Sequence, residues 1–392
     1  MSDVFILAGQ RTAIGDYGKA LKDVAPSQLG EIAIRAALAK SGVEAADVGH
    51  VVMGHVIHTE PKDAYISRVS AVNAGIPVGT PAFTVNRLCG SGLQAVVSAA
   101  QTIMLGDTSI AVAGGAESMS RGGYLLPAER WGARLGDGKV IDMVVGALHD
   151  PFGNGHMGIT AENVAAQYGL TRAAQDAFAA QSHQRAAAAQ AAGYFKDQIT
   201  PVEIPGRKGV TIFDTDEHVR ADTTTETLAS LKPVFKKDGT VTAGNASPLN
   251  DAGAALVLAS GAEVSKRNLT PMARIVAYGH AGVAPEVMGL GPIPASQNAL
   301  RRAGLSAADM DVIESNEAFA AQACAVSRDL GLDPAKVNPN GGAVALGHPI
   351  GASGAIIAIK AMYELARIKG RYALVTMCIG GGQGIALILE RV

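Results

Sequence analysis

Cysteine is scarce in this chain of 392 residues, and its scarcity argues against two classes of protein. Cys89, Cys324 and Cys378 are too few and too far apart for a disulfide scaffold, and such usage is typical of a reducing compartment. No two of them have the spacing of a CxxC zinc motif. We therefore expect neither a disulfide-stabilised secreted domain nor a metal centre.

A strong excess of one charge sign and long apolar runs are also lacking. The 33 basic and 35 acidic residues leave a formal net charge of −2, which gives no electrostatic reason to expect nucleic acid or an acidic membrane surface as a partner. We find no long uncharged apolar run and expect no transmembrane helix. Residues 1–15 lack a basic segment followed by a long apolar one, so we expect no secretory signal and a cytoplasmic location.

Small apolar residues are abundant, while aromatic residues make up only 4% of a chain that is 48% hydrophobic. This composition is typical of α/β packing, and the length predicts two or three domains. We expect buried strands at residues 4–9 and 51–56. Apolar residues at helical spacing predict a helix over 27–41 that ends at Gly42.

An internal repeat divides the chain. Residues 37–47 and 299–309 share six of eleven residues at an offset of 262, and the same offset brings Ser91-Gly92 onto Ser353-Gly354. The closing strands, 253–260 and 384–391, are only 131 residues apart, which predicts a large insertion in the first half. Chance similarity of Ala- and Gly-rich strings is the weaker explanation, because the matches share one unbroken offset. We predict two similar halves, 1–118 plus 251–270 and 271–392, and an inserted domain, 119–250.

Two of the cysteines stand where chemistry is expected. Cys89 precedes a predicted helix in the sequence CGSG, and a helix N-terminus stabilises a thiolate. Cys378 ends an apolar strand that runs into glycines, and such a strand end is a common place for α/β sites. The alternative for either residue is a buried structural cysteine. Cys324 has no such context, and we interpret it as core packing.

A glycine-rich stretch, residues 338–354, contains His348. Glycine is costly to order, so its density here predicts tight turns or close backbone approach to a ligand. The repeat places His348 three residues before the counterpart of Cys89, and a base beside a thiol is what nucleophilic catalysis requires. A lone histidine is more often structural, and that alternative stays open. A P-loop is excluded because His348 stands where that motif requires lysine, and too few residues follow the glycines at 380–384 for a dinucleotide site.

Five motifs together resemble the signatures of the thiolase family, and among thiolases those of bacterial acetyl-CoA acetyltransferases and β-ketothiolases. They are CGSG at 89–92, GNAS at 244–247, NEAFA at 316–320, GHPIGASG at 347–354 and CIGGGQG at 378–384. The resemblance covers essentially the whole chain. It implies a fold of two similar halves in αβαβα layers, with an inserted loop domain that binds coenzyme A and makes oligomer contacts. It also implies a homodimer that often pairs into a tetramer.

The resemblance also implies catalytic roles. Cys89 would be the nucleophile that carries the acyl group, His348 its activating base, and Cys378 the acid and base at the α-carbon of the second substrate. His348 and a water held by Asn316 would form one oxyanion hole, and the backbone N–H groups of Cys89 and Gly380 a second one.

Coenzyme A contacts follow from the same resemblance. Ser247 would contact the pantetheine arm, Arg220 the adenine-phosphate end, and Met288 would narrow the acyl pocket in favour of short chains. The tunnel would be lined by Leu148, His156, Met157, Phe235, Ala243, Ala318 and Phe319. Pro248 stands where the family pattern has glycine, and it removes an N–H group beside Ser247.

The resemblance implies reversible condensation of two acetyl-CoA molecules, or thiolysis of short 3-ketoacyl-CoA, with ping-pong kinetics through an acyl-Cys89 thioester. Coenzyme A would be substrate and product, with no other cofactor, in fatty-acid or polyhydroxyalkanoate metabolism. Two alternatives remain. A decarboxylating enzyme of the ketoacyl-synthase type would have histidine in place of Cys378, and a non-catalytic relative would have lost one of the three reactive side chains.

Overall fold

The first half of the chain builds a mixed sheet in the computed structural model, which describes residues 3–207 and 209–392. Its strands lie in the order β4-β3-β5-β11-β1. β3 is parallel to β4 and β5, whereas β11 is antiparallel to β5 and β1. The strands are β1 (Val4–Thr12), β3 (His50–Gly54), β4 (Ala82–Val85), β5 (Ile110–Ser118) and β11 (Asn250–Ser260).

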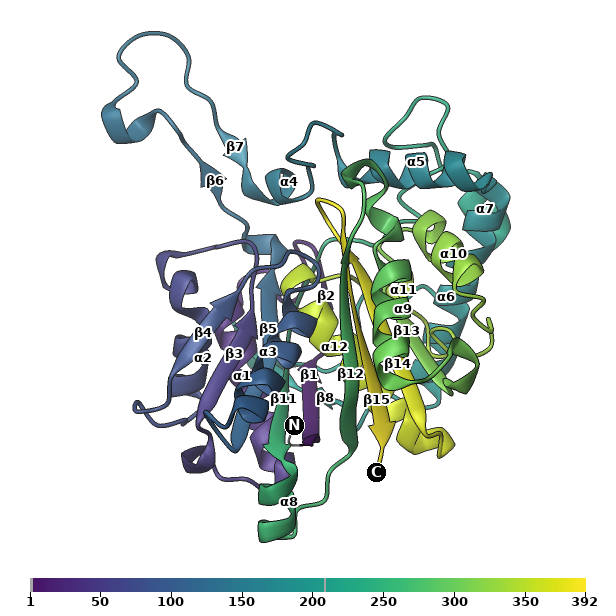
Figure 1. Ribbon diagram of the computed structural model, residues 1–392. Coiled ribbons are helices and arrows are strands. Elements are labelled where there is room, and N and C mark those ends of the chain that lie inside the picture. The colour runs from purple at the N-terminus through teal and green to yellow at the C-terminus, as the bar shows by residue number, and fades with distance from the viewer. Residues whose placement is uncertain (1–2, 208) are drawn as a thin grey trace.

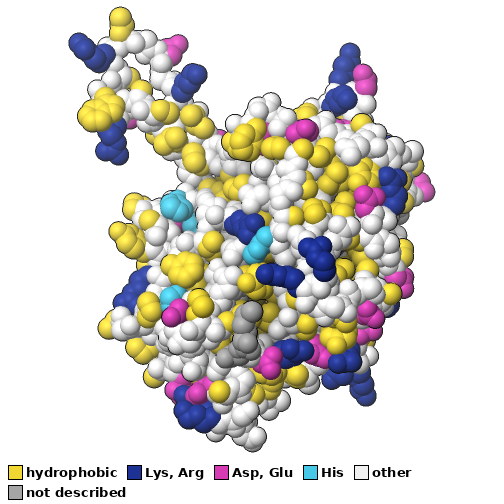
Figure 2. Space-filling view, in the orientation of Figure 1, with side chains coloured by type: hydrophobic (Ala, Val, Ile, Leu, Met, Phe, Trp, Pro, Cys, Tyr) yellow, Lys and Arg dark blue, Asp and Glu magenta, His cyan; other side chains and the backbone are white. Residues whose placement is uncertain are grey.

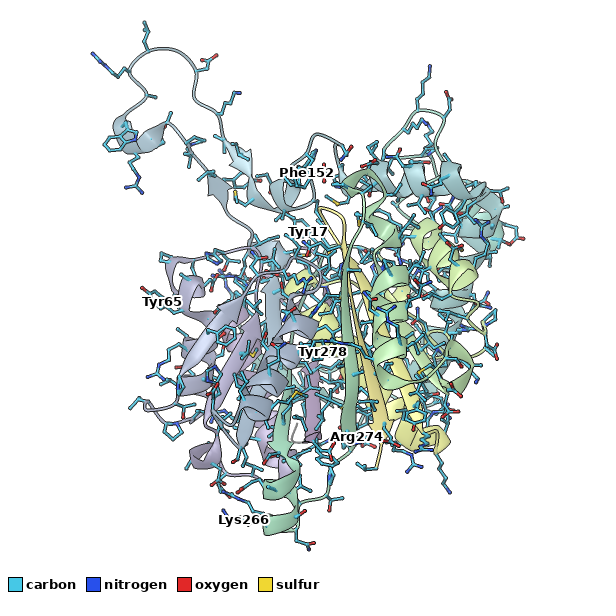
Figure 3. The ribbon with its side chains drawn as sticks, viewed as in Figure 1. Tyr17, Tyr65, Phe152, Lys266, Arg274 and Tyr278 are labelled. Atoms are coloured by element: carbon cyan, nitrogen blue, oxygen red, sulfur yellow. The ribbon has the colours of Figure 1, made fainter. Side chains whose placement is uncertain are left out.

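The second half repeats this pattern in the order β13-β14-β15-β12. Its strands are β12 (Ala273–Gly282), β13 (Val312–Ser315), β14 (Tyr372–Ile379) and β15 (Gln383–Arg391). The two sheets meet at one short seam, where Phe5 and Ile6 of β1 pair with Arg274 and Ala273 of β12. Arg274 also forms an ion pair with Glu390 at 2.6 Å (Figure 3).

Helices complete the αβαβα layers (Figure 1). α3 (Ser91–Leu105) and α12 (Ile350–Ile368) pack against each other between the two sheets. α1 (Pro26–Ser41) and α2 (Ile66–Asn73) cover the outer side of the first sheet, and α9 (Pro292–Ala303) covers the second. α1 ends at Gly42, whose φ of 73° suits a left-handed helix cap, so the predicted end is confirmed.

The predicted repeat is confirmed by the positions of equivalent elements. The 3-10 turns η1 (Ala45–Asp47) and η6 (Ala307–Asp309) lie 262 residues apart, as do the first residues of β3 and β13. Ser91 begins α3, and its counterpart Ser353 lies in the first turn of α12. The two central helices are therefore related elements that face each other across the middle of the molecule.

The glycines near His348 serve helix packing. A Cβ atom on Gly115 would lie 2.0 Å from the carbonyl oxygen of Gly351, and one on Gly354 would lie 2.3 Å from the backbone nitrogen of Leu93. The start of α12 therefore touches β5 and α3 at backbone distance. The predicted close approach of the backbone is confirmed at Gly351 and Gly354, but it is made to packed protein, β5 and α3, and not to a ligand.

One stretch, Leu88–Leu105, is apolar and long enough to cross a membrane by length and composition alone, which corrects the expectation that no such run exists. In this structure it is the central helix α3 and the turn before it, and α3 packs on α12, β3 and β5. A core helix meets the same criterion of length and apolarity as a membrane span. The stretch therefore carries no argument for a membrane.

The segment between β5 and β11 differs in character from the halves. It begins with an arm that projects away from the body (Figure 1) and exposes hydrophobic side chains along its length (Figure 2), including Tyr124, Leu126, Trp131, Leu135 and Val140. Its elements are η3 (Met119–Arg121), β6 (Tyr124–Leu125), η4 (Glu129–Trp131), β7 (Ile141–Asp142), α4 (Met143–Ala147), α5 (Met157–Tyr168), α6 (Arg172–Ala191), β8 (Ile199–Thr200), β9 (Val202–Gly206), β10 (Gly209–Phe213) and α7 (Thr225–Ala229).

Short elements complete the chain: β2 (Gly15–Asp16), η2 (Pro61–Tyr65), α8 (Gly261–Arg267), η5 (Pro285–Leu290), α10 (Ala320–Asp329) and α11 (Ala343–Leu346). The domain boundaries drawn from the sequence at residues 119, 251 and 271 stay predictions.

Candidate active site

A cavity of about 490 Å³ is lined by residues from both halves and from the inserted segment. Most of the residues singled out from the sequence line it: Cys89, Leu148, His156, Met157, Arg220, Phe235, Ala243, Ser247, Met288, Ala318, Phe319, His348 and Gly380. Cys378 and Asn316 are not among the described residues that line it. The fold thus brings together side chains that are more than 250 residues apart in sequence.

Cys89 lies on a sharp turn directly before α3. Leu88, the preceding residue, has a φ of 45°, which is a strained conformation for a residue other than glycine. The turn is fixed on both sides, because Leu88 N–H donates to Asn86 Oδ1 at 3.0 Å and Ser91 Oγ donates to the carbonyl of Leu88 at 2.6 Å. The strained turn places the Cys89 sulfur on the cavity wall.

The Cys89 thiol is protonated at neutral pH. Its surroundings within the protein raise its pKa to about 11, although the backbone N–H of Gly380 acts in the opposite direction. The prediction that the helix start lowers this pKa was therefore wrong, because loss of hydration outweighs the favourable N–H groups. A thiol of this kind needs a base before it can act as a nucleophile.

Cys378 is the next-to-last residue of β14, whose end packs against the Cys89 turn: a Cβ atom on Gly90 would lie 2.5 Å from Ile379. The Cys378 side chain is buried and packs with Met157, Met288 and Phe319 behind the cavity wall. Burial raises the pKa of Cys378, and the charged form of Cys89 would raise it further. The exposed ring of Phe152 stands beside the glycine turn that follows Cys378 (Figure 3).

His348 is held as a neutral base. The Ser353 hydroxyl donates its one proton to the carbonyl of Pro349 at 2.9 Å, so its oxygen accepts the Nδ1–H of His348 at 2.7 Å. Within residues 3–207 and 209–392, no protein group bonds to His348 Nε2. Burial lowers the pKa of His348 to about 4, so Nε2 carries a lone pair at neutral pH.

Asn316 is buried behind the cavity wall rather than on it. Its backbone N–H donates to Thr376 O at 3.0 Å, but neither end of its amide has a partner among the residues that the structure describes. Cys324 lies on α10, is only partly buried, and lines a separate cavity with Glu317. Its expected place in the core is therefore corrected to a half-buried helix position.

The wall opposite Cys89 is built by the segment that contains Ser247. The Ser247 hydroxyl and its backbone N–H both donate to the carbonyl of Ala318 at 3.0 Å, so the hydroxyl oxygen keeps its lone pairs for a ligand. Pro248 lines the cavity without an N–H group. His156 accepts the Gly158 N–H at Nδ1, which makes Nε2–H a donor, and its ring stacks on Phe235 at 4.7 Å.

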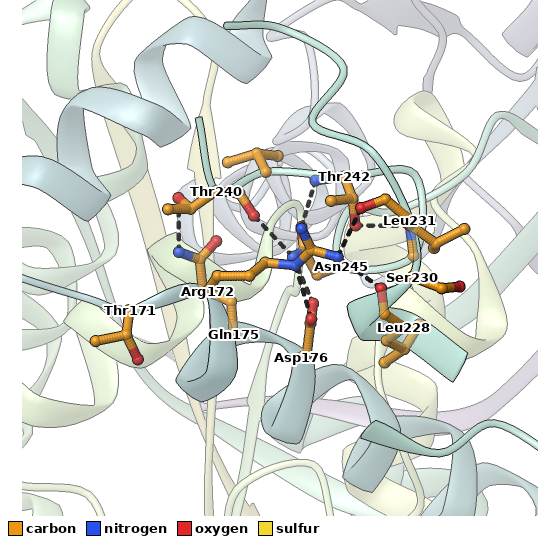
Figure 4. A network of polar contacts seen from close by, with 12 residues as sticks. Thr171, Arg172, Gln175, Asp176, Leu228, Ser230, Leu231, Thr240, Thr242 and Asn245 are labelled. Carbon is orange, nitrogen blue, oxygen red and sulfur yellow. Dashed lines mark hydrogen bonds and ion pairs between the residues drawn. The ribbon is translucent and has the colours of Figure 1, made fainter. Parts of the chain in front are cut away.

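A buried polar network fixes this wall to α6 (Figure 4). Asp176 accepts from Arg172 at 2.7 Å and from the Asn245 amide at 2.9 Å. Arg172 also donates to the carbonyls of Leu228 and Leu231 at 2.6 and 3.0 Å. The segment 228–247 is therefore anchored by charge-assisted hydrogen bonds, which are stronger than neutral ones.

The mouth of the cavity carries a histidine that sequence reasoning missed. His218 lines the cavity beside Arg220, and its Nδ1 bonds to Asp16 Oδ1 at 2.7 Å. Although burial raises it, contacts with His218 and Lys19 hold the pKa of Asp16 at about 2. The carboxylate thus holds the His218 ring in place. A sequence signal was lacking because Asp16 and His218 lie 202 positions apart.

Apolar residues around Cys89 were also missed. Met119, Val144 and Ile350 pack together with it and line the cavity. They come from separate segments and share no motif, so only the folded chain identifies them.

The geometry and the motifs define a member of one family. The family model described as the N-terminal domain of thiolase matches residues 4–262, and that of the C-terminal domain of thiolase matches residues 269–391. The chain belongs to the thiolase family.

Particular relatives narrow the comparison. The chain is 64% identical over 391 residues to the beta-ketothiolase BktB of Cupriavidus necator, covering 100% of this chain and 99% of that one. It is 51% identical over 393 residues to an acetyl-CoA acetyltransferase of Pseudomonas aeruginosa, covering 100% of both. The crystal structure of the Bacillus anthracis acetyl-CoA acetyltransferase superposes with a TM-score of 0.98 at 46% identity, covering 100% of this chain and 99% of that one. Human mitochondrial 3-ketoacyl-CoA thiolase in complex with CoA gives 0.96 at 46%, covering 100% and 98%.

Proposed function

We propose that this protein is an acetyl-CoA C-acetyltransferase of the β-ketothiolase type. It condenses two acetyl-CoA molecules to acetoacetyl-CoA and, in reverse, cleaves short 3-ketoacyl-CoA with coenzyme A. One observation carries the proposal: Cys89 and the neutral base His348 line one cavity, and the strand end that carries Cys378 packs against the Cys89 turn, since a Cβ atom on Gly90 would lie 2.5 Å from Ile379. Two thiols divide the work, because one is acylated while the other moves a proton.

In the first half-reaction, Cys89 attacks the thioester carbonyl carbon of acetyl-CoA while His348 Nε2 takes the thiol proton. A C–S bond to Cys89 forms, the C–S bond to coenzyme A breaks, and His348 returns the proton to the leaving thiolate. The N–H groups of Cys89 and Gly380 stabilise the oxyanion formed at this carbonyl. The N–H group of Gly380 acts on the Cys89 sulfur in the structure, which supports this position.

In the second half-reaction, Cys378 moves a proton at C2 of the other acetyl-CoA. During condensation its thiolate removes that proton, the carbanion attacks the acyl-Cys89 carbonyl carbon, and a C–C bond forms as the C–S bond to Cys89 breaks. The proton on Cys378 then passes to the departing Cys89 thiolate. During thiolysis the proton returns from Cys378 to the carbanion. The raised pKa of Cys378 suits the thiolysis step, because the residue is protonated before it acts as the acid. A water on Asn316, together with His348, stabilises the enolate oxygen.

Coenzyme A is proposed as substrate and product, with no further cofactor. Its pantetheine arm would pass Ser247 and Phe235, where the wall is apolar and one hydroxyl oxygen is available. Its phosphates would meet Arg220, whose positive charge favours them, beside His218. Met288, which is 3% exposed, would limit the acyl chain to a short length.

We further propose a cytoplasmic homotetramer that acts in fatty-acid or polyhydroxyalkanoate metabolism. The projecting arm supports self-association, because side chains such as Trp131 and Leu135 are 84% and 99% exposed. An apolar surface of this kind marks a protein contact in a soluble protein.

Acetyl-CoA labelling tests the proposal directly. The wild-type protein incubated with acetyl-CoA should gain one acetyl group on Cys89, identified by mass spectrometry of a peptide, and it should cleave acetoacetyl-CoA when coenzyme A is added. The Cys378→Ala variant should still be acetylated but should not turn over. Acetylation that persists in Cys89→Ala, or the absence of any thioester, would overturn the assignment.

A further inference from the structure

A second, much smaller cavity lies behind the proposed site, between β13 and α12. Its volume is about 10 Å³, and its polar lining comes from Glu314, Ser315, Asn316, Ser353 and Lys360. Ser353 and Lys360 are seven residues apart in α12, so they lie on one face of that helix. Glu314 lies in β13, and Asn316 directly follows its last residue, Ser315. The two side chains are two positions apart in extended chain and therefore point to one side. The cavity is thus enclosed by a helix face and a strand end.

Polar atoms around this cavity are not satisfied by protein. In the described part of the chain, Glu314 Oε1 and both ends of the Asn316 amide have no hydrogen-bond partner, although the two residues are 1% and 2% exposed. Lys360 Nζ donates to Glu314 Oε2 at 2.8 Å and to Gly341 O at 2.6 Å. Among the described residues these are its hydrogen bonds, whereas an ammonium group has three donors. Buried polar groups without a partner are rare in native proteins and usually indicate an ordered ligand or water.

The size and the charges of the cavity indicate which molecule or ion it can hold. About 10–15 Å³ is the space that one water molecule needs. The Lys360 ammonium disfavours a cation, and the Glu314 carboxylate disfavours an anion. A water molecule can accept a hydrogen bond from Lys360 and donate to carboxylate and amide oxygens at the same time.

We propose that this cavity holds one ordered water, which accepts from Lys360 Nζ and donates to Glu314 Oε1 and Asn316 Oδ1. The water fixes the orientation of the Asn316 amide, so that Nδ2 is directed away from Lys360 and toward the reacting centre. Glu314 and Lys360 are then positioning residues, which act on the reaction through the water and Asn316. This inference rests on the proposed function, because the role of Asn316 belongs to that proposal.

The ion pair of Glu314 and Lys360 is suited to orienting the water because it presents both a negative and a positive charge. Burial raises the pKa of Glu314, while its contact with Lys360 acts against that shift. A hydrogen bond from the water to Oε1 further stabilises the carboxylate, whose second oxygen is already bound. Ser353 lines the same cavity and binds Nδ1 of His348 at 2.7 Å. One buried site therefore lies behind both groups that are proposed to stabilise the enolate oxygen.

The first test is a high-resolution crystal structure of the wild-type protein. We expect an ordered water within about 3.2 Å of Glu314 Oε1, Asn316 Oδ1 and Lys360 Nζ. An empty cavity, or Asn316 Nδ2 facing Glu314, overturns the inference without any use of activity.

The second test is a double-mutant cycle on condensation kinetics. Glu314→Gln replaces one oxygen acceptor by an amide donor without changing the size of the side chain. We expect kcat to fall about tenfold, the scale of one lost hydrogen bond, with an unchanged KM for acetyl-CoA. Because both residues act through one water, Asn316→Ala combined with Glu314→Gln should be no slower than Asn316→Ala alone.

A matched control separates positioning from stability. Asp216→Asn alters another fully buried ion pair, that of Arg11 and Asp216 at 2.7 Å, so it should lower stability and leave kcat unchanged. If the effects of Asn316→Ala and Glu314→Gln multiply, the inference is wrong. If Asn316→Ala has no effect on kcat, the proposed role of Asn316 fails. The crystal structure then still shows, independently, whether the small cavity holds the proposed water.

Discussion

Replacing Ser353 by alanine tests how the protein sets the tautomer of His348. In the native protein the Ser353 oxygen accepts the Nδ1–H of His348 at 2.7 Å because the serine proton is donated to Pro349 O. This arrangement leaves the lone pair on Nε2, where the base must act. In Ser353→Ala the Nδ1–H loses its acceptor inside the protein, since His348 is only 5% exposed. The reactive tautomer is then no longer favoured over the other one.

The size of the effect follows from the cost of an unpaired buried donor, which is about 1–3 kcal/mol. If the reactive tautomer bears that cost, acylation of Cys89 slows about 5- to 150-fold, at about 1.4 kcal/mol per tenfold change in rate. The KM for acetyl-CoA should change little, because Ser353 is not among the described residues that line the large cavity.

Rapid-quench measurement of Cys89 acetylation is the suitable assay, because it isolates the step in which His348 acts. Ser353→Thr keeps the hydroxyl group and should retain most of the rate. Thr102→Ala removes a helix hydroxyl that bonds only to Ala99 O among the described residues, at 2.8 Å, and it should leave acetylation unchanged. Equal acetylation rates in Ser353→Ala and the wild-type protein would refute the tautomer argument.

Three further predictions concern stability, substrate affinity and assembly. The pKa of His348 is lowered from 6.5 to about 4, so the unfolded chain binds this proton first as the pH falls. The contribution of neutral His348 to the free energy of unfolding is complete above pH 6.5. It decreases by about 2 kcal/mol at pH 5 and by about 3 kcal/mol at pH 4. Urea unfolding should show this loss in the wild-type protein and a smaller one in His348→Asn; equal losses would contradict it. Asp176→Ala removes the acceptor of Arg172 and Asn245, so the wall at Ser247 should loosen and the KM for coenzyme A should rise about fivefold with less change in kcat. A fall in kcat alone would count against that role, and Asp176→Asn serves as the conservative control. Replacing the exposed Trp131 and Leu135 by glutamate should reduce the mass measured by light scattering from tetramer to dimer, and an unchanged mass would show that the arm is not the contact.

Much of the fold could be predicted from the sequence because the chain contains an internal repeat, whose two copies can be compared with each other. The offset of 262 between residues 37–47 and 299–309 identifies equivalent elements, and the structure places η1 and η6 at that same offset. The apolar stretch before Gly106 and the run after His348 were predicted to be helices, which α3 and α12 confirm; their place between the two sheets came from the structure. The expectation that the chain has no long apolar run was wrong for Leu88–Leu105, because a helix packed between two sheets is as apolar as a membrane span.

The reactive residues were also predictable. Cys89, His348 and Cys378 each stand at a strand end or helix start within a glycine-rich motif, which is a local property of the chain. The pKa values were not predictable, since they depend on burial by distant segments. The helix start at Cys89 indicated a lowered pKa, whereas the folded protein raises it to about 11.

The sequence by itself determined the repeat and the family and pointed to the proposed reactive residues, because these depend on residue types at fixed spacing. The tertiary structure decided what those residues can do. It made Cys89 a protonated thiol and His348 a neutral base by removing water from around them, and it set the tautomer of His348 through Ser353. It also placed Glu314, Lys360 and Asn316 around one small cavity. Hydration and enclosure depend on which segments meet in space, and spacing along the chain does not specify them.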